Sequence, residues 1–519
     1  MRKLAMITLL FPGVLFLFAG CARLPTYVEA QATARAGGCW PDYLPTPPLV
    51  TMTPAGTVVP GTPQPTATPL TICPPRPGRT AVAWPTPVPP PPAFPTQAGH
   101  PWQTGGGQET TLLLPSAVLA LDLAVHPTAG WPAVAATVWA GTDDPDRVMV
   151  SVYNPESARW SIARQVDLGP AQIGHYSRTV RLAVSGSGRV TVIWGMSDPD
   201  FTDNDPPSGI WASDSADDGE TWSAPTRIAA GCRRVNDVVA DGDGRLAVLL
   251  VCDEARGNYL AMMLRSADGA WQPLERLPVA TNYFSESSLV LVGTGSAATV
   301  VGLTFVMEGG VATGYLLRRP LSGDTPAAIT RVSVSAPADW QLGARMWNLR
   351  GLAFTRPSGS GVIFTFTDAE GNGGAYALTS LDGGLSWGGL ERIAAPFTPG
   401  FIFSAAPAYD PAADRLVAVW SCCAGEVLRA APATHYGSWS APGSGRWQTL
   451  GGTAPLPLVL GSRVAGETTS AQAANSRHTW VAWVEGLKQV VVRSLDLNQL
   501  IPVDAYPTAA PFIAPTVTP

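Results

Sequence analysis

Six polar side chains occupy similar positions, near the start of an apolar run, in four successive copies of a sequence repeat. They are Arg178, Arg181, Arg234, Tyr283, Glu286 and Arg350. Arginine suits anion recognition because its planar guanidinium binds a carboxylate through two hydrogen bonds. A tyrosine beside a glutamate can be activated as a nucleophile. The set predicts an anion-binding pocket with an activatable tyrosine, and the alternative is that all six are ordinary polar residues of loops and of a wet channel.

Acidic residues gather in two further loops of the sequence. One contains Asp198, Asp200, Asp203 and Asp205, and the other contains Asp143, Asp144 and Asp146. Carboxylate oxygens at such spacing can hold Ca²⁺, but their order does not match an EF-hand, and solvated acidic loops are common. Calcium and a solvated loop are therefore the two interpretations. No other cofactor is expected, because the chain has no His/Cys metal spacing, phosphate-binding glycine loop or nucleophile elbow.

Two eight-residue segments carry the same residue types at the same spacing. The first contains Ser215, Asp217, Gly219, Thr221 and Trp222, and the second contains Ser380, Asp382, Gly384, Ser386 and Trp387. An aspartate at this position can accept hydrogen bonds from the backbone N–H groups of its own turn. The glycine permits positive φ, and the tryptophan can fill a gap against adjoining strands. We therefore predict a structural role, so that replacing Asp382 lowers stability without changing ligand affinity.

An apolar β-run that ends in an acid recurs seven times along the chain. The copies are Val134–Asp143, Val190–Asp198, Leu246–Asp253, Val300–Glu308, Val362–Asp368, Leu416–Glu426 and Trp480–Glu485. Their starts are separated by roughly 53 to 65 residues, a period that is typical of four-stranded propeller blades. Each copy is preceded by one apolar strand and followed by a third, and most are followed by a fourth.

The seventh copy has a third strand, residues 489–494, but no fourth before the chain becomes proline-rich. Residues 110–114, ahead of the first blade, are apolar and could fill that place, which would close the ring with strands from both termini. Closure of this kind removes exposed sheet edges. The predicted fold is all-β: a single β-propeller of four-stranded blades, with seven blades favoured and six if one copy is spurious.

The segments Ser215–Trp222 (S-A-D-D-G-E-T-W) and Ser380–Trp387 (S-L-D-G-G-L-S-W) match the Asp-box pattern S-x-D-x-G-x-[T/S]-W. The chain thus resembles the sialidase-like Asp-box (BNR repeat) β-propellers. Ser266–Trp271 looks like a shortened copy, and Gly437–Trp439 like a more eroded one. Proteins that share the box include sialidases, other glycosidases, sorting receptors and assembly factors, and in them the box lies at the blade periphery. Fold alone does not choose among these functions.

The resemblance implies a specific catalytic arrangement if the chain is a sialidase. Sialidases clamp a sugar carboxylate with three arginines, use a tyrosine assisted by a glutamate as nucleophile, and use an aspartate as proton donor. The first family arginine normally lies in an Arg-Ile-Pro or Arg-Leu-Pro motif where the propeller begins. Here Leu119–Pro127 (L-A-L-D-L-A-V-H-P) contains no arginine. No residue is therefore assigned as catalytic, and Arg178, Arg181, Arg234, Tyr283, Glu286 and Arg350 are candidate pocket residues.

The N-terminal residues 1–20 are predicted to be an export signal. Arg2 and Lys3 precede the apolar stretch Leu4–Phe18, and Ala19 and Gly20 precede Cys21. The pattern resembles the lipobox of bacterial lipoproteins, which implies that Cys21 carries a diacylglyceryl group that anchors the protein to a membrane. The alternative is an ordinary cleaved signal peptide that happens to contain a cysteine.

The remaining domain organisation follows from composition. Residues 21–104 form a Pro/Thr-rich stalk that is predicted to be disordered, because 20 of the 51 prolines fall within residues 41–101. Residues 105–505 form the propeller, and residues 506–519 are a second proline-rich tail. This organisation places the propeller outside the cytoplasm, lipid-anchored to the cell envelope.

Seven cysteines in an exported protein suggest disulfides. Cys232 and Cys252 flank a hairpin with its turn at residues 241–244, and counting outward from the turn places them opposite each other. We predict a cross-strand bond between them. The adjacent Cys422 and Cys423 are either a strained vicinal disulfide or free thiols.

The charge balance limits the class of partner. Charged residues make up 14 % of the chain and the net charge is −6, which argues against nucleic acid and against an electrostatic hold on anionic lipid. The leading hypothesis is a monomeric surface-anchored lipoprotein whose propeller binds a glycan or a surface protein. The alternatives are an exo-sialidase or other glycoside hydrolase, and an envelope assembly scaffold.

Overall fold

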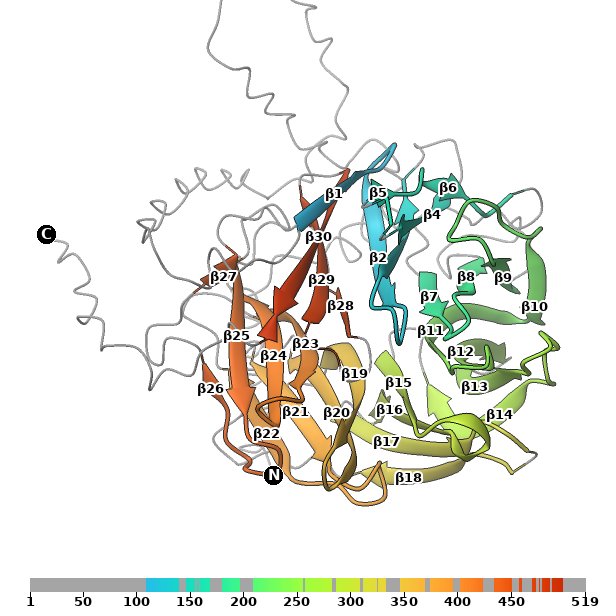
Figure 1. The fold of residues 1–519 in the computed structure, drawn as a ribbon. Helices are drawn as coiled ribbons and strands as arrows, with labels where there is room; N and C mark the ends of the chain where they lie inside the picture. Colours follow the sequence, from blue (N-terminus) through green and yellow to red (C-terminus); the bar gives the residue numbers. More distant parts are fainter. Residues whose placement is uncertain are drawn as a thin grey trace, which may run out of the picture. The chain divides into compact units, whose positions relative to one another are not determined.

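The fold is a β-propeller of seven blades, seen in a computed structural model (Figure 1). The structure describes residues 109–497 except for the segments 140–145, 155, 158, 169–179, 197–208, 255–256, 282–285, 309–310, 324, 333–345, 369–373, 395–401, 423–433, 450–456, 460–468, 473–475, 477 and 486–487. All described residues belong to one unit, residues 97–519. The predicted export signal, Cys21, the stalk and the C-terminal tail lie outside the described residues.

Each blade is an antiparallel sheet in which successive strands pair with their neighbours from the axis outward. Blade 1 contains β2 (Val118–Val125), β3 (Pro132–Val138), β4 (Arg147–Asn154), β5 (Arg159–Trp160) and β6 (Arg164–Gln165). Blade 2 contains β7 (Val180–Val184), β8 (Val190–Met196), β9 (Gly209–Ser215) and β10 (Thr226–Ala230). Blade 3 contains β11 (Cys232–Ala240), β12 (Leu246–Glu254), β13 (Gly257–Arg265) and β14 (Glu275–Thr281).

The second half of the ring repeats this order. Blade 4 contains β15 (Glu286–Val292), the 3-10 turn η3 (Gly295–Ala297), β16 (Thr299–Glu308), β17 (Val311–Pro320) and β18 (Ala328–Val332). Blade 5 contains β19 (Met346–Arg356), β20 (Gly359–Asp368), β21 (Ala375–Ser380) and β22 (Leu390–Ala394). Blade 6 contains β23 (Ile402–Asp410), β24 (Arg415–Cys422), β25 (Thr434–Ser440), β26 (Gln448–Thr449) and β27 (Pro457–Val459).

Blade 7 is assembled from both ends of the described chain. It contains β28 (Thr469–Gln472), β29 (His478–Glu485), β30 (Gln489–Asp496) and, as its outermost strand, β1 (Glu109–Leu113). β1 pairs antiparallel with β30, from Glu109 opposite Arg493 to Leu113 opposite Gln489. The innermost strands of neighbouring blades contact each other around the whole ring, including β2 and β28. The predicted seven-blade fold is confirmed, and the six-blade alternative is excluded.

The seven repeated apolar runs are the second strands of the blades. They read as nearly continuous apolar sequence because a strand inside a propeller is buried on both faces. In β12, for example, Leu246, Val248 and Leu250 pack against blade 2, while Leu249 and Val251 pack against blade 4. Alternating side chains of one strand therefore serve two different seams.

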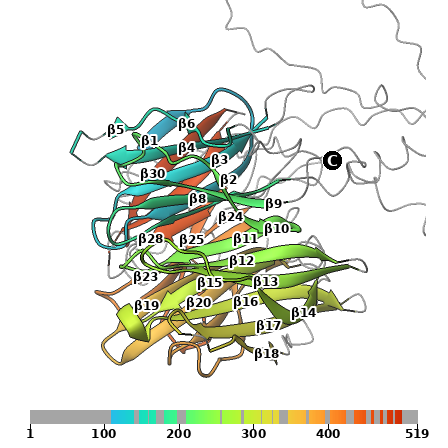
Figure 2. The ribbon, with the colours of Figure 1, turned by 90° about the vertical axis from the view of Figure 1, so that its right-hand side faces the viewer.

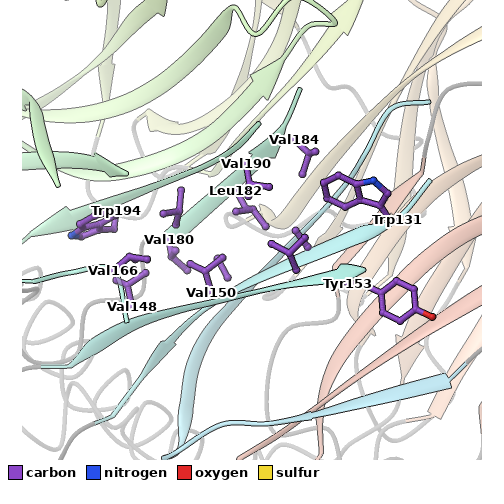
Figure 3. Packing of buried hydrophobic residues seen from close by; sticks show 14 residues of the cluster. Trp131, Val148, Val150, Tyr153, Val166, Val180, Leu182, Val184, Val190 and Trp194 are labelled. Carbon is purple, nitrogen blue, oxygen red and sulfur yellow. The ribbon is translucent and has the colours of Figure 1, made fainter. Parts of the chain in front are cut away.

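The hydrophobic core lies in the seams between blades. The described residues form seven buried clusters, one for each seam of the ring. Figure 3 shows the seam between blades 1 and 2, where Trp131 and Val150 of blade 1 meet Leu182 and Val190 of blade 2. Figure 2 gives a side view of the ring, in which the sheets of successive blades lie one against the next. Among the described residues, no helix is long and apolar enough to cross a membrane.

Candidate functional site

The channel face consists of the innermost strands β2, β7, β11, β15, β19, β23 and β28 together with the edge of the propeller at which they begin. Neighbouring first strands are joined by hydrogen bonds from a side chain of one blade to the backbone of the next. Asp122 of blade 1 accepts the Leu182 backbone N–H of blade 2 at 2.8 Å. Asp237 of blade 3 accepts the Leu289 N–H of blade 4 at 2.7 Å. The same kind of contact at two seams shows that first strands of neighbouring blades run alongside each other.

Arg181 also makes a hydrogen bond between neighbouring blades. Its side chain is buried, at 6 % exposure. Its Nε donates to the Asn236 carbonyl oxygen of blade 3 at 2.6 Å, and its Nη1 donates to the Val180 carbonyl oxygen at 2.9 Å. One donor therefore holds protein backbone across the seam between blades 2 and 3, and a second holds the backbone of its own strand.

Arg234 and Glu286 are also brought together. Arg234 lies near the start of β11 and Glu286 begins β15, and the Arg234 Nη2 donates to Glu286 Oε1 at 3.0 Å. Both side chains are largely buried, and they join blades 3 and 4. Beside them, Arg233 Nε donates to Asp253 Oδ2 at 2.5 Å within blade 3.

Asp122 is an acid of the channel that sequence analysis did not single out. Burial raises the pKa of its carboxyl to about 6, against the opposing effect of the charges on Arg181 and Arg350; the Asp237 charge raises it further. Arg350, which is half-buried near the start of β19 in blade 5, thus acts electrostatically on blade 1. The sequence feature that could have identified Asp122 is its place as the single acid in the apolar run L-A-L-D-L-A-V. An acid in such a run is buried with the strand, so it needs polar partners there.

The remaining predicted site residues lie outside the described residues. They are Arg178, Tyr283, Asp198, Asp200, Asp203 and Asp205, so the Tyr283–Glu286 pair and the calcium loop stay predictions. Within the described parts of the chain, no three His, Cys, Asp or Glu side chains gather into a group that could hold a metal ion.

The turn face is the opposite edge, where third and fourth strands are joined. After β9, the Ser215 Oγ donates to Asp217 Oδ1 at 2.8 Å and accepts the Gly219 N–H at 2.9 Å. Asp217 Oδ1 also accepts the Thr221 N–H at 2.9 Å. Bonds from the Thr221 hydroxyl and N–H, followed by the Ser215 hydroxyl, lower the pKa of Asp217.

The second box, after β21, has the same geometry. Asp382 Oδ1 accepts the N–H groups of Leu385 at 3.0 Å and Ser386 at 2.8 Å, and the Gly384 N–H donates to Ser380 Oγ at 2.8 Å. Partial burial raises the pKa of Asp382, but the bonds from Ser386, Ser380 and Leu385 outweigh it and lower the pKa to about 2. Both carboxylates are thus occupied by their own turn.

The glycine and tryptophan of each box face the preceding blade. Gly219 has a φ of +84°, and a Cβ there would lie 2.7 Å from Val152 Cγ2 of blade 1. The four tryptophans of the third-to-fourth-strand turns each pack against the seam cluster shared with the preceding blade; they are Trp222, Trp271, Trp387 and Trp447. Each turn therefore closes the outer part of a seam.

One predicted box remnant was wrong. Gly437–Trp439 lies inside β25, where Ser438 pairs with Thr449 and Trp439 with Gln448, and not in a turn. The turn of blade 6 follows it, at residues 440–447 (S-A-P-G-S-G-R-W), with Ser440 and Trp447 at the box spacing and Pro442 in place of the aspartate. Trp447 Nε1 donates to Glu391 Oε2 of blade 5 at 2.7 Å. The Ser-to-Trp spacing alone would have identified this turn.

The cysteines predicted to pair across the first hairpin of blade 3 are register partners. Cys232 lies opposite Cys252 in the β11–β12 ladder, and a disulfide joins them. Cys422 ends β24, and Cys423 lies outside the described residues.

Comparison with known proteins gave fold similarities only. No protein-family profile and no curated protein sequence matches the chain. Among solved structures, a Hadza microbial sialidase matches with 14 % identity and a TM-score of 0.44, over 74 % of this chain and 66 % of the sialidase. Trypanosoma rangeli sialidase in complex with the inhibitor DANA matches with 10 % identity and a TM-score of 0.39, over 62 % and 58 %.

A polysaccharide lyase is similar at the same level. An ulvan lyase bound to a sugar fragment matches with 10 % identity and a TM-score of 0.47, over 76 % of this chain and 100 % of the lyase. The chain spans less than two thirds of the length of the two sialidases. Identities this low assign neither an activity nor a residue role.

Proposed function

We propose that this protein is an exported, lipid-anchored recognition module whose propeller binds a glycan or a surface protein on its channel face. The proposal combines the signal-like residues 1–20 and Cys21 with the Pro-rich stalk and a closed, Asp-box-type propeller. The lipid holds the chain at a membrane, the stalk spaces the propeller from it, and the channel face presents the ligand-binding groups.

The observation that carries recognition over catalysis is the pairing of the channel-face arginines with other blades. A carboxylate clamp needs guanidinium groups that meet the ligand. Arg181 instead holds the Asn236 backbone, and Arg234 is bonded to Glu286. Opening either contact leaves a buried or half-buried polar group without its partner, which costs about 1–3 kcal/mol. A ligand that does not compete for these arginines is therefore favoured.

The lengths of the connections support a binding role for this face. On this face, the connections between second and third strands differ in length. β12 and β13 are joined by residues 255–256 only, whereas residues 197–208 join β8 to β9 and residues 423–433 join β24 to β25. On the turn face, the connections between first and second strands stay short, as at residues 185–189 and 241–245. Connections of variable length on a constant framework are where proteins place binding residues.

A glycoside hydrolase, most specifically an exo-sialidase, is the second candidate, and Asp122 favours it. A carboxyl with a pKa near 6 can donate a proton at neutral pH, and two arginines act on it. Against this role, Asp122 accepts a backbone N–H across a seam, as Asp237 does in blade 3, and a repeated contact of this kind serves the framework.

The first experiment separates these two functions. The full chain, purified in detergent, is incubated with fluorogenic glycosides that include sialosides, and the same preparation is applied to a glycan array. We expect binding without turnover from folded protein. Release of sialic acid that is lost in Tyr283→Phe, Arg350→Ala or Asp122→Asn would make the protein an enzyme and overturn the proposal.

The anchor has its own test. Cells that express the chain are fed labelled palmitate, and we expect label in the wild-type protein and none in Cys21→Ala. Equal labelling of both chains would refute anchoring through Cys21 and leave the cleaved-signal alternative.

A further inference from the structure

Trp139 is the exposed tryptophan of the described surface. It is 37 % exposed, whereas the other tryptophans whose side chains the structure describes are buried or half-buried in the seams. Trp131, Trp194 and Trp420, for example, are at most 8 % exposed. The solvent-exposed part of this indole offers a ligand a flat apolar surface at a defined place.

The backbone places Trp139 on the channel face, close to the axis. Trp139 is the first residue after β3. Its backbone N–H donates to the carbonyl oxygen of Ala117 at 2.7 Å, and Ala117 immediately precedes the innermost strand β2. Val138 pairs with Val118 immediately below it. The tryptophan is therefore held at the edge where first strands begin, the same edge that carries Arg234 and Glu286.

The described arginines of the channel face already interact with protein groups. Arg233 is bonded to Asp253 and Arg234 to Glu286, and the charges of Arg181 and Arg350 act on Asp122. An incoming carboxylate would be repelled by the protein carboxylates that are already bonded to these arginines, and displacing one of them would leave a partly buried group without its partner. A neutral ligand meets no such competition.

We propose that the channel face recognises a neutral glycan, with Trp139 as the residue on which a pyranose ring stacks. This inference rests on the proposed recognition function and specifies its ligand class. The C–H groups on one face of a pyranose pack on an aromatic ring, and its hydroxyls are both donors and acceptors. Because a guanidinium has five N–H donors and a carboxylate has several lone pairs, a sugar hydroxyl can bond to a paired side chain of this face while the pair stays closed.

The test compares neutral and acidic forms of the same sugars. The full chain in detergent is applied to an array of neutral gluco-, manno-, galacto- and fuco-configured oligosaccharides together with their sialylated and uronate-containing counterparts. We expect binding to neutral members, and an affinity about tenfold lower in Trp139→Ala, since one stacking contact is removed. Ile162→Ala is the matched control, because Ile162 is 76 % exposed on the outer edge of the same blade; its affinity should equal that of the wild type.

A second measurement uses the unmodified protein and does not depend on the alanine variant folding. A bound neutral oligosaccharide should shield an exposed indole from acrylamide quenching of tryptophan fluorescence, and this shielding should disappear in Trp139→Phe. Binding of neutral glycans with equal affinity to wild type and Trp139→Ala would overturn the role of Trp139 but keep the recognition function. Tighter binding of the acidic counterparts would overturn the neutral ligand class. Failure of folded protein to bind any glycan would remove glycan recognition itself.

Discussion

The turn face and the channel face use the same side chains in opposite ways. On the turn face, Asp217 and Asp382 bond to residues two to four positions away in the same turn. On the channel face, Asp122 and Asp237 bond to backbone groups 60 and 52 positions away in the next blade. An aspartate is thus a local turn-former at the turn face and a long-range connector along the innermost strands.

The difference determines how each face responds to change. A box closes on itself, so its contribution should be independent of other boxes. A channel contact joins two blades that also share a seam, so removing it should affect both blades and couple to neighbouring contacts. Substitutions at the two faces should therefore differ in the size of their effect on stability and in whether their effects are additive.

The largest effect is expected at Arg181. Arg181→Ala removes two hydrogen bonds from a charged donor and leaves the buried Asn236 carbonyl without this partner, so the free energy of unfolding should fall by about 3 kcal/mol. Urea denaturation followed by tryptophan fluorescence measures the change. Arg159→Ala, at an exposed position in β5, is the control and should change stability by less than about 0.5 kcal/mol. Equal stability of both variants would mean that the Arg181 contact between blades 2 and 3 does not stabilise the fold.

A smaller loss is expected in the boxes. Asp382→Ala removes the acceptor of the Leu385 and Ser386 N–H groups, but water can replace it because the turn is exposed, so the loss should be about 1 kcal/mol. Asp217→Ala should change stability in the same direction, and the double variant should show the sum, since the boxes lie on different blades. Ligand affinity should stay unchanged; a selective loss of binding would contradict the structural role.

The pH dependence of stability should report Asp122. Its pKa is about 6 in the folded protein, above the ordinary aspartate value of 3.8, so the folded state binds the proton more tightly than the unfolded chain does. The free energy of unfolding should therefore rise by about 1 kcal/mol as pH falls from about 7.5 to about 5. Burial lowers the pKa of His126, which works in the opposite direction over the same range and is common to wild type and variant. Asp122→Asn keeps an acceptor for Leu182 and should lack the rise. The free energy of unfolding is measured by urea denaturation at each pH. If it depends on pH in the same way in the wild type and in Asp122→Asn, Asp122 is not the group responsible for the rise.

The smallest effect concerns the Arg234–Glu286 pair. A double-mutant cycle with Arg234→Ala and Glu286→Ala should give a coupling energy of about 0.5–1 kcal/mol, since the pair is only partly accessible to water and salt. The same cycle applied to Asp217→Ala and Asp382→Ala should give none. Additivity at the channel pair, or coupling between the boxes, would contradict the contrast between the two faces.

The sequence was most informative where a contact is local or repeated. The period of the apolar runs predicted seven blades because every second strand is buried on both faces, and residues 110–114 were predicted to close the ring where β1 now does so. Asp122 was missed because one acid in a run has no periodic signal. The prediction at Gly437–Trp439 was wrong because Trp447, and not Trp439, occupies the box position after β25.

The amino-acid sequence was sufficient to predict the all-β fold and the two box turns and to favour seven blades, because strand periodicity and turn chemistry depend on neighbours along the chain. The roles of the channel residues depend on the packing of the blades. Arg181, Arg234 and Glu286 have the residue types of an anion site, but their partners are about one blade away in sequence, and the packing of neighbouring blades brings them together. The charge that a ligand meets on the channel face depends on those pairings, so it follows from the packing of blades and not from composition.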